Sequence, residues 1–202
     1  MGGGAEDIGK DYEITDRHVF RKYSGLSLDE LAELLKTVEG REKLLVAHFL
    51  CENGDPRGPD VLWSFYRDCP LSVVGGLVCF IETCGDGDLK RYADKIFTWF
   101  VEALKNTWSE VREATVNGLY CINLRSPEYR KRVLEILDKV ALEDDYRYVR
   151  VHALAYTAVI KYGCEKVERV LALISKFYSE ENIRGLVEFL DSDEPYFRQE
   201  AA

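Results

Sequence analysis

The chain has 202 residues, of which 47% are hydrophobic and 31% charged, and its formal net charge is −9 at pH 7. This composition lies outside the range of disordered proteins and predicts a folded chain with a substantial core. No apolar run approaches the roughly 20 residues that a membrane-spanning helix needs, so we expect no membrane contact. The negative charge disfavours unspecific nucleic-acid binding, because phosphate contacts need clustered Lys and Arg.

The start of the chain carries no export signal. Residues 1–7 lack the basic and apolar segments of a signal peptide, so we expect a cytoplasmic protein. A single Gln alongside abundant Glu, Lys, Arg and Tyr is typical of a thermophile. The six cysteines form no C-x-x-C pair, which argues against a zinc knuckle or a redox motif. Their thiol or disulfide state stays open, because thermophiles also form intracellular disulfides.

The first strong helix signal follows a polar, glycine-rich segment. We expect residues 1–25 to form a tail, with residues 14–23 as a candidate docking helix. Ser27 can cap a helix, and Glu30 three residues later completes a capping box. Gly40 is the expected end of this helix. Its apolar stripe comprises Leu28, Leu31, Leu34, Leu35 and Val38.

Further helices are expected along the rest of the chain. A dense apolar run over residues 42–52 ends at the breaker sequence Asn-Gly-Asp-Pro of residues 53–56. Apolar residues at three- and four-residue steps then predict amphipathic helices. The first of these helices is expected at residues 60–67, and the second runs from a break near Pro70 to Thr83. Three more are expected at residues 89–104, 133–140 and 167–177. Since no segment shows sustained strand alternation, the sequence predicts an all-α fold.

Three segments of the chain repeat one another at a fixed distance. The pairs Val73-Val74, Val111-Arg112 and Val149-Arg150 are each 38 residues apart, and a large side chain stands seven residues before each pair. A fourth pair, Phe197-Arg198, follows Leu190 by the same seven residues but lies 48 residues after Val149. Self-similarity at this period predicts a solenoid of stacked helical hairpins, each too short to bury its apolar stripe alone.

The repeated segments resemble HEAT repeats. Residues 193–202 carry an Asp, a Pro, an apolar-Arg pair and two alanines, as second helices of that family do. Residues 145–153 match without the Pro, residues 108–119 match more weakly, and residues 70–81 depart further. The resemblance implies an all-α superhelix of about four to five helical hairpins over residues 26–202. It also implies that Arg112, Arg150 and Arg198 bond structurally to an Asp of a neighbouring repeat.

Candidate catalytic and metal-binding groups are few. His48 lies at helical spacing from Cys51 and Glu52, the arrangement of a thiolate nucleophile, but its apolar neighbours favour a core helix. Asp86-Gly87-Asp88 resembles the start of a calcium loop. Lys90 and Phe97 stand where that loop needs ligands, so helix capping is the better interpretation. The sequence therefore predicts no metal and no cofactor.

The resulting hypothesis is a non-enzymatic module that binds a protein or peptide on the concave surface of its second helices. An alternative is nucleic-acid binding, by resemblance to the HEAT-like DNA alkylation-repair glycosylases, with aromatic and basic side chains including Tyr148. Deoxyhypusine hydroxylases are excluded because the chain has no His-Glu dipeptide. A third alternative is self-assembly through the C-terminal repeat around Phe197. The expected partner-binding residues are Trp108, Arg112, Asn117, Tyr146, Arg147 and Arg150.

Overall fold

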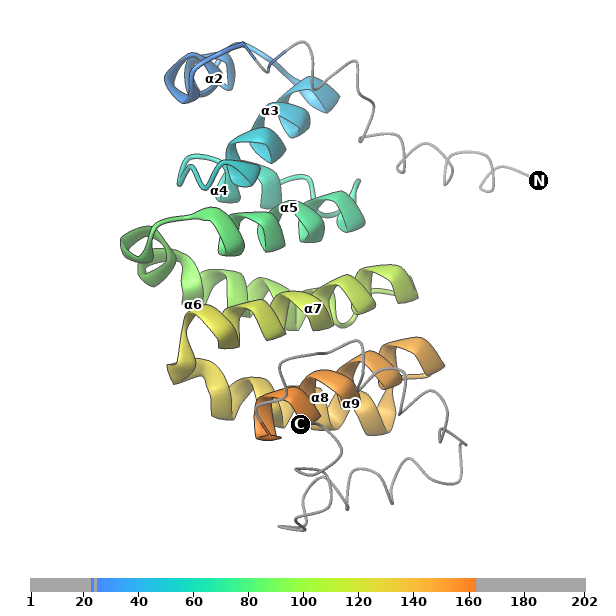
Figure 1. Cartoon of the computed structure of the whole chain (residues 1–202). Helices are drawn as coiled ribbons and strands as arrows, with labels where there is room; N and C mark the ends of the chain where they lie inside the picture. The colour runs from blue at the N-terminus through green and yellow to red at the C-terminus, as the bar shows by residue number, and fades with distance from the viewer. Residues whose placement is uncertain (1–22, 24, 163–202) are drawn as a thin grey trace, which may run out of the picture. The chain divides into compact units, whose positions relative to one another are not determined.

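The computed structural model describes residue 23 and residues 25–162, and this part of the chain is helical without any strand (Figure 1). The prediction of an all-α fold is confirmed there. The expectations for residues 14–22, for the helix at 167–177 and for Phe197-Arg198 lie outside the described residues. The chain divides into two compact units, Met1–Ala103 and Leu104–Ala202, and each is described by itself. Within the described ranges, no helix combines the length and apolarity that crossing a bilayer requires.

The first unit is a stack of helices whose apolar side chains meet in one core. Its helices are α2 (Leu28–Leu34), α3 (Gly40–Glu52), α4 (Pro59–Trp63), α5 (Pro70–Thr83) and α6 (Asp86–Ala103). Helix α3 packs against α2, α4 and α5, and α5 also packs against α6. The largest fully buried side chains of this core are Leu31, Leu44, Leu50, Leu62, Leu77, Phe80, Ile81, Leu89, Ile96 and Phe100.

The N-terminal end of this unit follows its sequence signals in part. The capping box is confirmed: the Ser27 Oγ accepts from the Glu30 amide, and the Glu30 carboxylate accepts from the Ser27 amide at 2.7 Å. Tyr23 is helical and buried, and it donates from its hydroxyl to Glu42 at 2.6 Å. Gly40 was expected to end the first helix, but it begins α3 instead. There a φ of +54° reverses the chain at low cost for a residue without a Cβ.

The end of α3 is fixed by backbone geometry. Gly54 has a φ of +69°, and its amide donates to the Cys51 carbonyl at 3.0 Å, while the Asp55 amide donates to the Leu50 carbonyl at 2.9 Å. These two bonds form a Schellman motif, which satisfies carbonyls that the helix leaves without partners. The predicted break at residues 53–56 is therefore a defined helix cap.

Helix α4 is shorter than expected, ending at Trp63 rather than near residue 67. Beyond Trp63 the backbone continues in turns, with the Phe65 amide donating to Leu62 and the Tyr66 amide to Trp63. Pro70 then begins α5, where its missing amide proton leaves no helical bond unmade. The Trp63 ring stacks with both Tyr66 and Trp99, at centroid distances of 4.3 and 5.0 Å, and so joins α4 to α6.

Residues 104–162, the described part of the second unit, contain three long helices. These are α7 (Ser109–Arg125), α8 (Arg130–Glu143) and α9 (Arg147–Tyr162), with a 3-10 turn η2 (Pro127–Tyr129) before α8. Helix α9 packs against α8 and also along α7. The core of this described part of the second unit comprises Val111, Val116, Leu119, Ile122, Val133, Leu137, Val149, Ala153 and Leu154.

The 38-residue recurrence falls on equivalent places in three helices. Val73, Val111 and Val149 lie in the first turns of α5, α7 and α9, and all three are fully buried. Each of these valines is therefore a buried residue near the start of its helix. The recurrence in the sequence thus reflects a recurrent role in packing.

Candidate interaction surface

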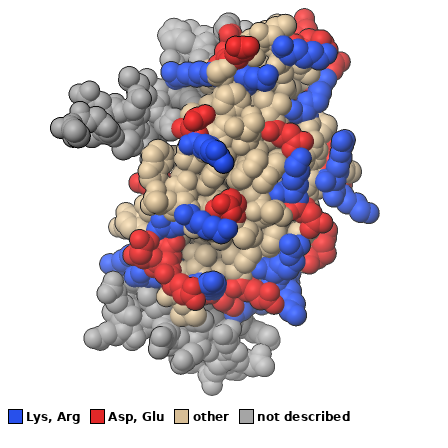
Figure 2. Space-filling view, turned by 180° about the vertical axis from the view of Figure 1, so that it is seen from behind, with Lys and Arg blue, Asp and Glu red and all other residues tan. Residues whose placement is uncertain are grey.

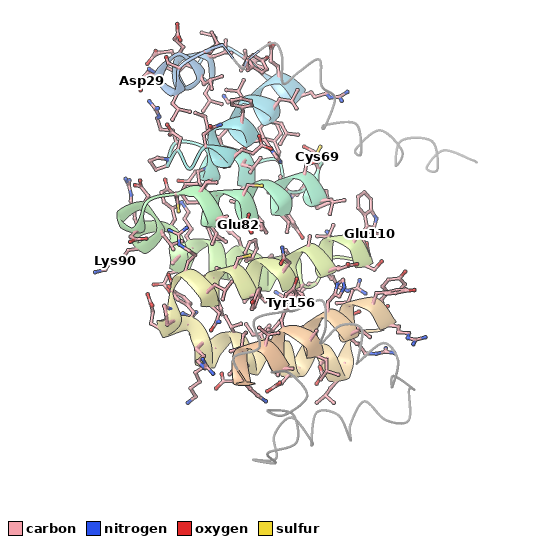
Figure 3. The ribbon with its side chains drawn as sticks, in the orientation of Figure 1. Asp29, Cys69, Glu82, Lys90, Glu110 and Tyr156 are labelled. Carbon is pink, nitrogen blue, oxygen red and sulfur yellow. The ribbon has the colours of Figure 1, made fainter. Side chains whose placement is uncertain are left out.

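The side of α7 that meets α9 carries a row of paired side chains, which we call the paired strip: Glu113, Asn117 and Tyr120 of α7 with His152 and Tyr156 of α9. His152 Nδ1 lies 2.9 Å from the Glu113 Oε1, and the Tyr156 hydroxyl donates to the Asn117 Oδ1 at 2.9 Å. The Tyr120 and Tyr156 rings stack with centroids 4.5 Å apart. Figure 3 shows Tyr156 between the two helices.

The paired strip follows from the way the two helices run. Both polar pairs join residues 39 positions apart, so α7 and α9 are parallel and keep one register over more than a turn. The five side chains are half-exposed, so each contacts its partner and also faces solvent. Polar groups fixed by neighbours lose little conformational freedom on binding, which favours recognition of a second molecule.

The two tyrosines of the paired strip stay neutral under ordinary conditions. Burial and the nearby Cys121, Tyr120 and Glu113 raise the pKa of Tyr156 to about 12. Burial also raises the pKa of Tyr120 above its usual value. The Tyr156 hydroxyl is therefore a proton donor to Asn117, and the surface of the strip combines aromatic faces with the Asn117 amide and the Glu113 carboxylate.

A second cluster lies where α9 begins. Arg112 donates from Nε and Nη2 to the two carboxylate oxygens of Asp144 at 2.7 and 2.9 Å, and Nη2 also bonds to Asp145. Its Nη1 donates to the carbonyls of Asn106 and Thr107. Arg150 donates to the Asp144 backbone carbonyl at 2.6 Å. Two parallel bonds between a guanidinium and a carboxylate fix the geometry of this ion pair.

Asp144 is held ionised by this arrangement. Burial acts to raise its pKa, but hydrogen bonds from Arg112 and from the Tyr146 amide outweigh that and lower the pKa below its usual value. Arg112 is only 7% exposed and the Asp144 side chain 8% exposed. The pair therefore fixes the start of α9 against the start of α7.

The six residues expected to bind a partner do not form one group. Arg112 is buried in the cluster with Asp144, and Arg150 is half-exposed and bonded to the same residue. Asn117 belongs to the paired strip. The remaining three lie at the N-terminal ends of the helices: half-exposed Trp108 directly before α7, Tyr146 directly before α9, and exposed Arg147 as the first residue of α9.

The sequence did not indicate four members of the paired strip as binding residues: Glu113, Tyr120, His152 and Tyr156. The signal that could have found them is the repeat itself. Once residues 38 apart are assigned to parallel helices, residues about 38 apart on the same faces become candidate neighbours. Both observed polar pairs fit that spacing.

The surroundings of Cys51 do not favour a role as a nucleophile. The His48 Nδ1 lies 3.4 Å from the Glu52 carboxylate. Cys51 is fully buried, and burial together with Cys79 and nearby carboxylates raises its pKa well above the usual value. A reactive cysteine needs the opposite shift, so this group is a packing element of α3.

The acidic residues of the calcium-like sequence are used in a helix. Asp86 and Asp88 lie in the first turn of α6, where a carboxylate interacts favourably with the free amides of the helix end. Among the described residues, no group of three or more His, Cys, Asp or Glu side chains is placed to hold a metal ion.

Charges of both signs interleave on the face shown in Figure 2 and do not separate into one basic region. In the second unit, several cations are bonded to acids or carbonyls of the same unit, among them Arg112 with Asp144, Lys161 with Asp138, and Arg130 with the Ile160 carbonyl. No family model, no curated protein and no solved structure matches the chain.

Proposed function

We propose that the chain is a non-enzymatic α-solenoid of HEAT-like hairpins and that it binds a protein or peptide through the paired strip and the adjoining starts of α7 and α9. The observation that carries the proposal is the paired strip itself. Five half-exposed polar and aromatic side chains from two parallel helices are fixed by one another, yet still face solvent.

The chemistry of this surface suits a protein partner. Aromatic rings supply contact area at low entropic cost, and they are enriched where proteins bind one another. Beside the strip, Tyr146 and Tyr148 are 43% and 61% exposed, and their rings lie 5.7 Å apart. An exposed aromatic pair next to fixed polar groups has the mixed character of a protein interface.

The solenoid part of the proposal is supported by the recurrence of one packing position. Val73, Val111 and Val149 are fully buried in the first turns of three helices. Arg112 also bonds to an Asp that precedes the next repeated helix, as the resemblance implies. Repeats of this kind stack so that their second helices form an extended surface.

The test is affinity capture with the full chain and two matched variants. One variant, Glu113→Lys with Asn117→Arg, alters the paired strip at half-exposed positions. The control, Lys139→Glu on α8, changes an exposed residue of the same unit whose only described ion pair is a surface contact with Glu143. We expect the wild type and the control to retain a stoichiometric protein at low and moderate salt, and the strip variant to lose it.

Two results would contradict the proposal. Recovery of no stoichiometric protein by the wild type would remove its basis, and equal recovery by all three chains would move the interaction elsewhere. Binding to a labelled DNA or RNA that falls steeply with salt, and that is lost on Arg147→Ala with Arg150→Ala, would replace a protein partner by a nucleic acid.

A further inference from the structure

The chain contains two Asn-Gly pairs, Asn53-Gly54 at the end of α3 and Asn117-Gly118 within α7. Such pairs are the most open to spontaneous deamidation, because glycine has no side chain to shield its backbone nitrogen. In this reaction the glycine nitrogen bonds to the Cγ of Asn and releases its proton to solvent. The side-chain amide leaves as ammonia, and water then opens the resulting succinimide to aspartate or isoaspartate.

Both reacting groups of the first pair are engaged in the folded chain. The Asn53 Nδ2 donates to the Phe49 carbonyl at 2.8 Å, and the Gly54 amide donates to the Cys51 carbonyl at 3.0 Å. The nitrogen that must attack and the amide that must leave are thus both bonded to the last turn of α3. Ring closure requires both bonds to break first.

The C-terminal cap of α3 also packs closely against the end of α5. A Cβ built on Gly54 would lie 2.7 Å from both the Cys84 Cα and the Thr83 carbonyl oxygen. The Thr83 hydroxyl shares its proton between two carbonyls, that of Cys79 in α5 at 2.7 Å and that of Cys51 in α3 at 3.2 Å. Freeing the Asn53-Gly54 pair therefore means separating the end of α3 from the end of α5.

The second pair is held more firmly. Asn117 and Gly118 lie in the middle of α7, the Asn117 Oδ1 accepts from the Tyr156 hydroxyl, and Gly118 is buried. Opening this pair requires unwinding the interior of a packed helix. Helix ends open locally at lower free energy than helix interiors do, so the two pairs differ in how often they become reactive.

We propose that Asn53 is the site at which the folded chain deamidates, and that opening of the α3 cap sets the rate. The product weakens the cap that protected the site. A carboxylate at position 53 cannot donate to the Phe49 carbonyl, and its negative charge is unfavourable beside the free carbonyls of a helix C-terminus. Isoaspartate adds a backbone atom and breaks the register of the Schellman motif.

The experiment ages the full chain at neutral pH, in native buffer and in concentrated urea, and measures Asp and isoAsp at positions 53 and 117 by peptide mass spectrometry. We expect native Asn53 to react at least about tenfold more slowly than unfolded Asn53, because two hydrogen bonds must open. We also expect native Asn53 to react faster than native Asn117.

The variant Thr83→Val keeps the shape of that side chain and removes its hydroxyl. It should speed native deamidation at position 53 several-fold without changing the rate in urea. Equal rates at Asn53 in the native and unfolded chains, or a faster reaction at Asn117 in the native chain, would overturn the proposal. The comparison of the two pairs within the wild-type chain decides the matter even if the variant fails to fold.

Discussion

Two adjacent glycines in the middle of α5, Gly75 and Gly76, should respond oppositely to the same substitution. In a helix interior each glycine costs about 1 kcal/mol relative to Ala, because it loses more backbone freedom on folding. A Cβ on Gly75 would meet no atom within 4 Å. Gly75→Ala should therefore stabilise the first unit by about 0.5 to 1 kcal/mol.

Gly76 lies where α5 approaches α3 and α4. A Cβ there would lie 2.6 Å from the Leu62 Cδ2 and 2.9 Å from the His48 Cδ2. Leu62 is fully buried, so a shift that makes room for the Cβ has to take place within the core. Overpacking of this kind costs about 1 to 3 kcal/mol, which exceeds the gain in helix propensity. Gly76→Ala should therefore destabilise the unit by about 1 to 2 kcal/mol.

The measurement is urea and thermal unfolding of the wild type and both variants, followed by circular dichroism. A change of 1 kcal/mol corresponds to about 2 to 4 °C in melting temperature for a chain of this size. The two variants should thus move the melting temperature in opposite directions. If Gly76→Ala were as stable as Gly75→Ala, the close approach of α5 to α3 and α4 would be wrong.

Two further predictions concern ionisable groups. Because the folded-state pKa of Asp144 is lowered, its pair with Arg112 stabilises the chain above the unfolded pKa of about 3.9, and this contribution is lost as the pH falls through the lower folded value. Asp144→Asn should therefore lower the free energy of unfolding by about 2 to 4 kcal/mol at pH 7 and by clearly less near pH 3. If the free energies of unfolding of the two chains differed by the same amount at both pH values, this prediction would be wrong. Cys51, buried and with a raised pKa, should resist a maleimide reagent in the native chain and react once the chain unfolds, with half-exposed Cys69 labelled earlier. Labelling of native Cys51 at the rate of Cys69, read by mass spectrometry, would contradict that burial.

Local signals predicted the helices well where they act within one turn. The capping pair Ser27 and Glu30, the breakers after α3 and Pro70 before α5 all determine backbone geometry through immediate neighbours. Gly40 was placed at the wrong end of a helix boundary. A glycine favours a positive φ both where one helix ends and where the next begins, and only the surrounding chain distinguishes the two.

The candidate surface was predicted less completely than the fold. Aromatic and basic residues near the starts of the second helices were selected by type, and type does not distinguish an exposed guanidinium from a buried one. Arg112 is buried because Asp144, 32 residues later, is brought against it. His152 and Tyr156 gained their partners in the same way, from side chains 39 positions earlier.

The sequence by itself determined the helical class of the described residues, the break after α3, the bounds of α5 and the 38-residue period, because capping, breaking and amphipathic spacing are properties of residues close in the chain. Only the tertiary structure decided which side chains are paired, buried or left facing solvent. Those outcomes depend on the distance between helices that are far apart in sequence, and that distance is set by how the whole unit packs.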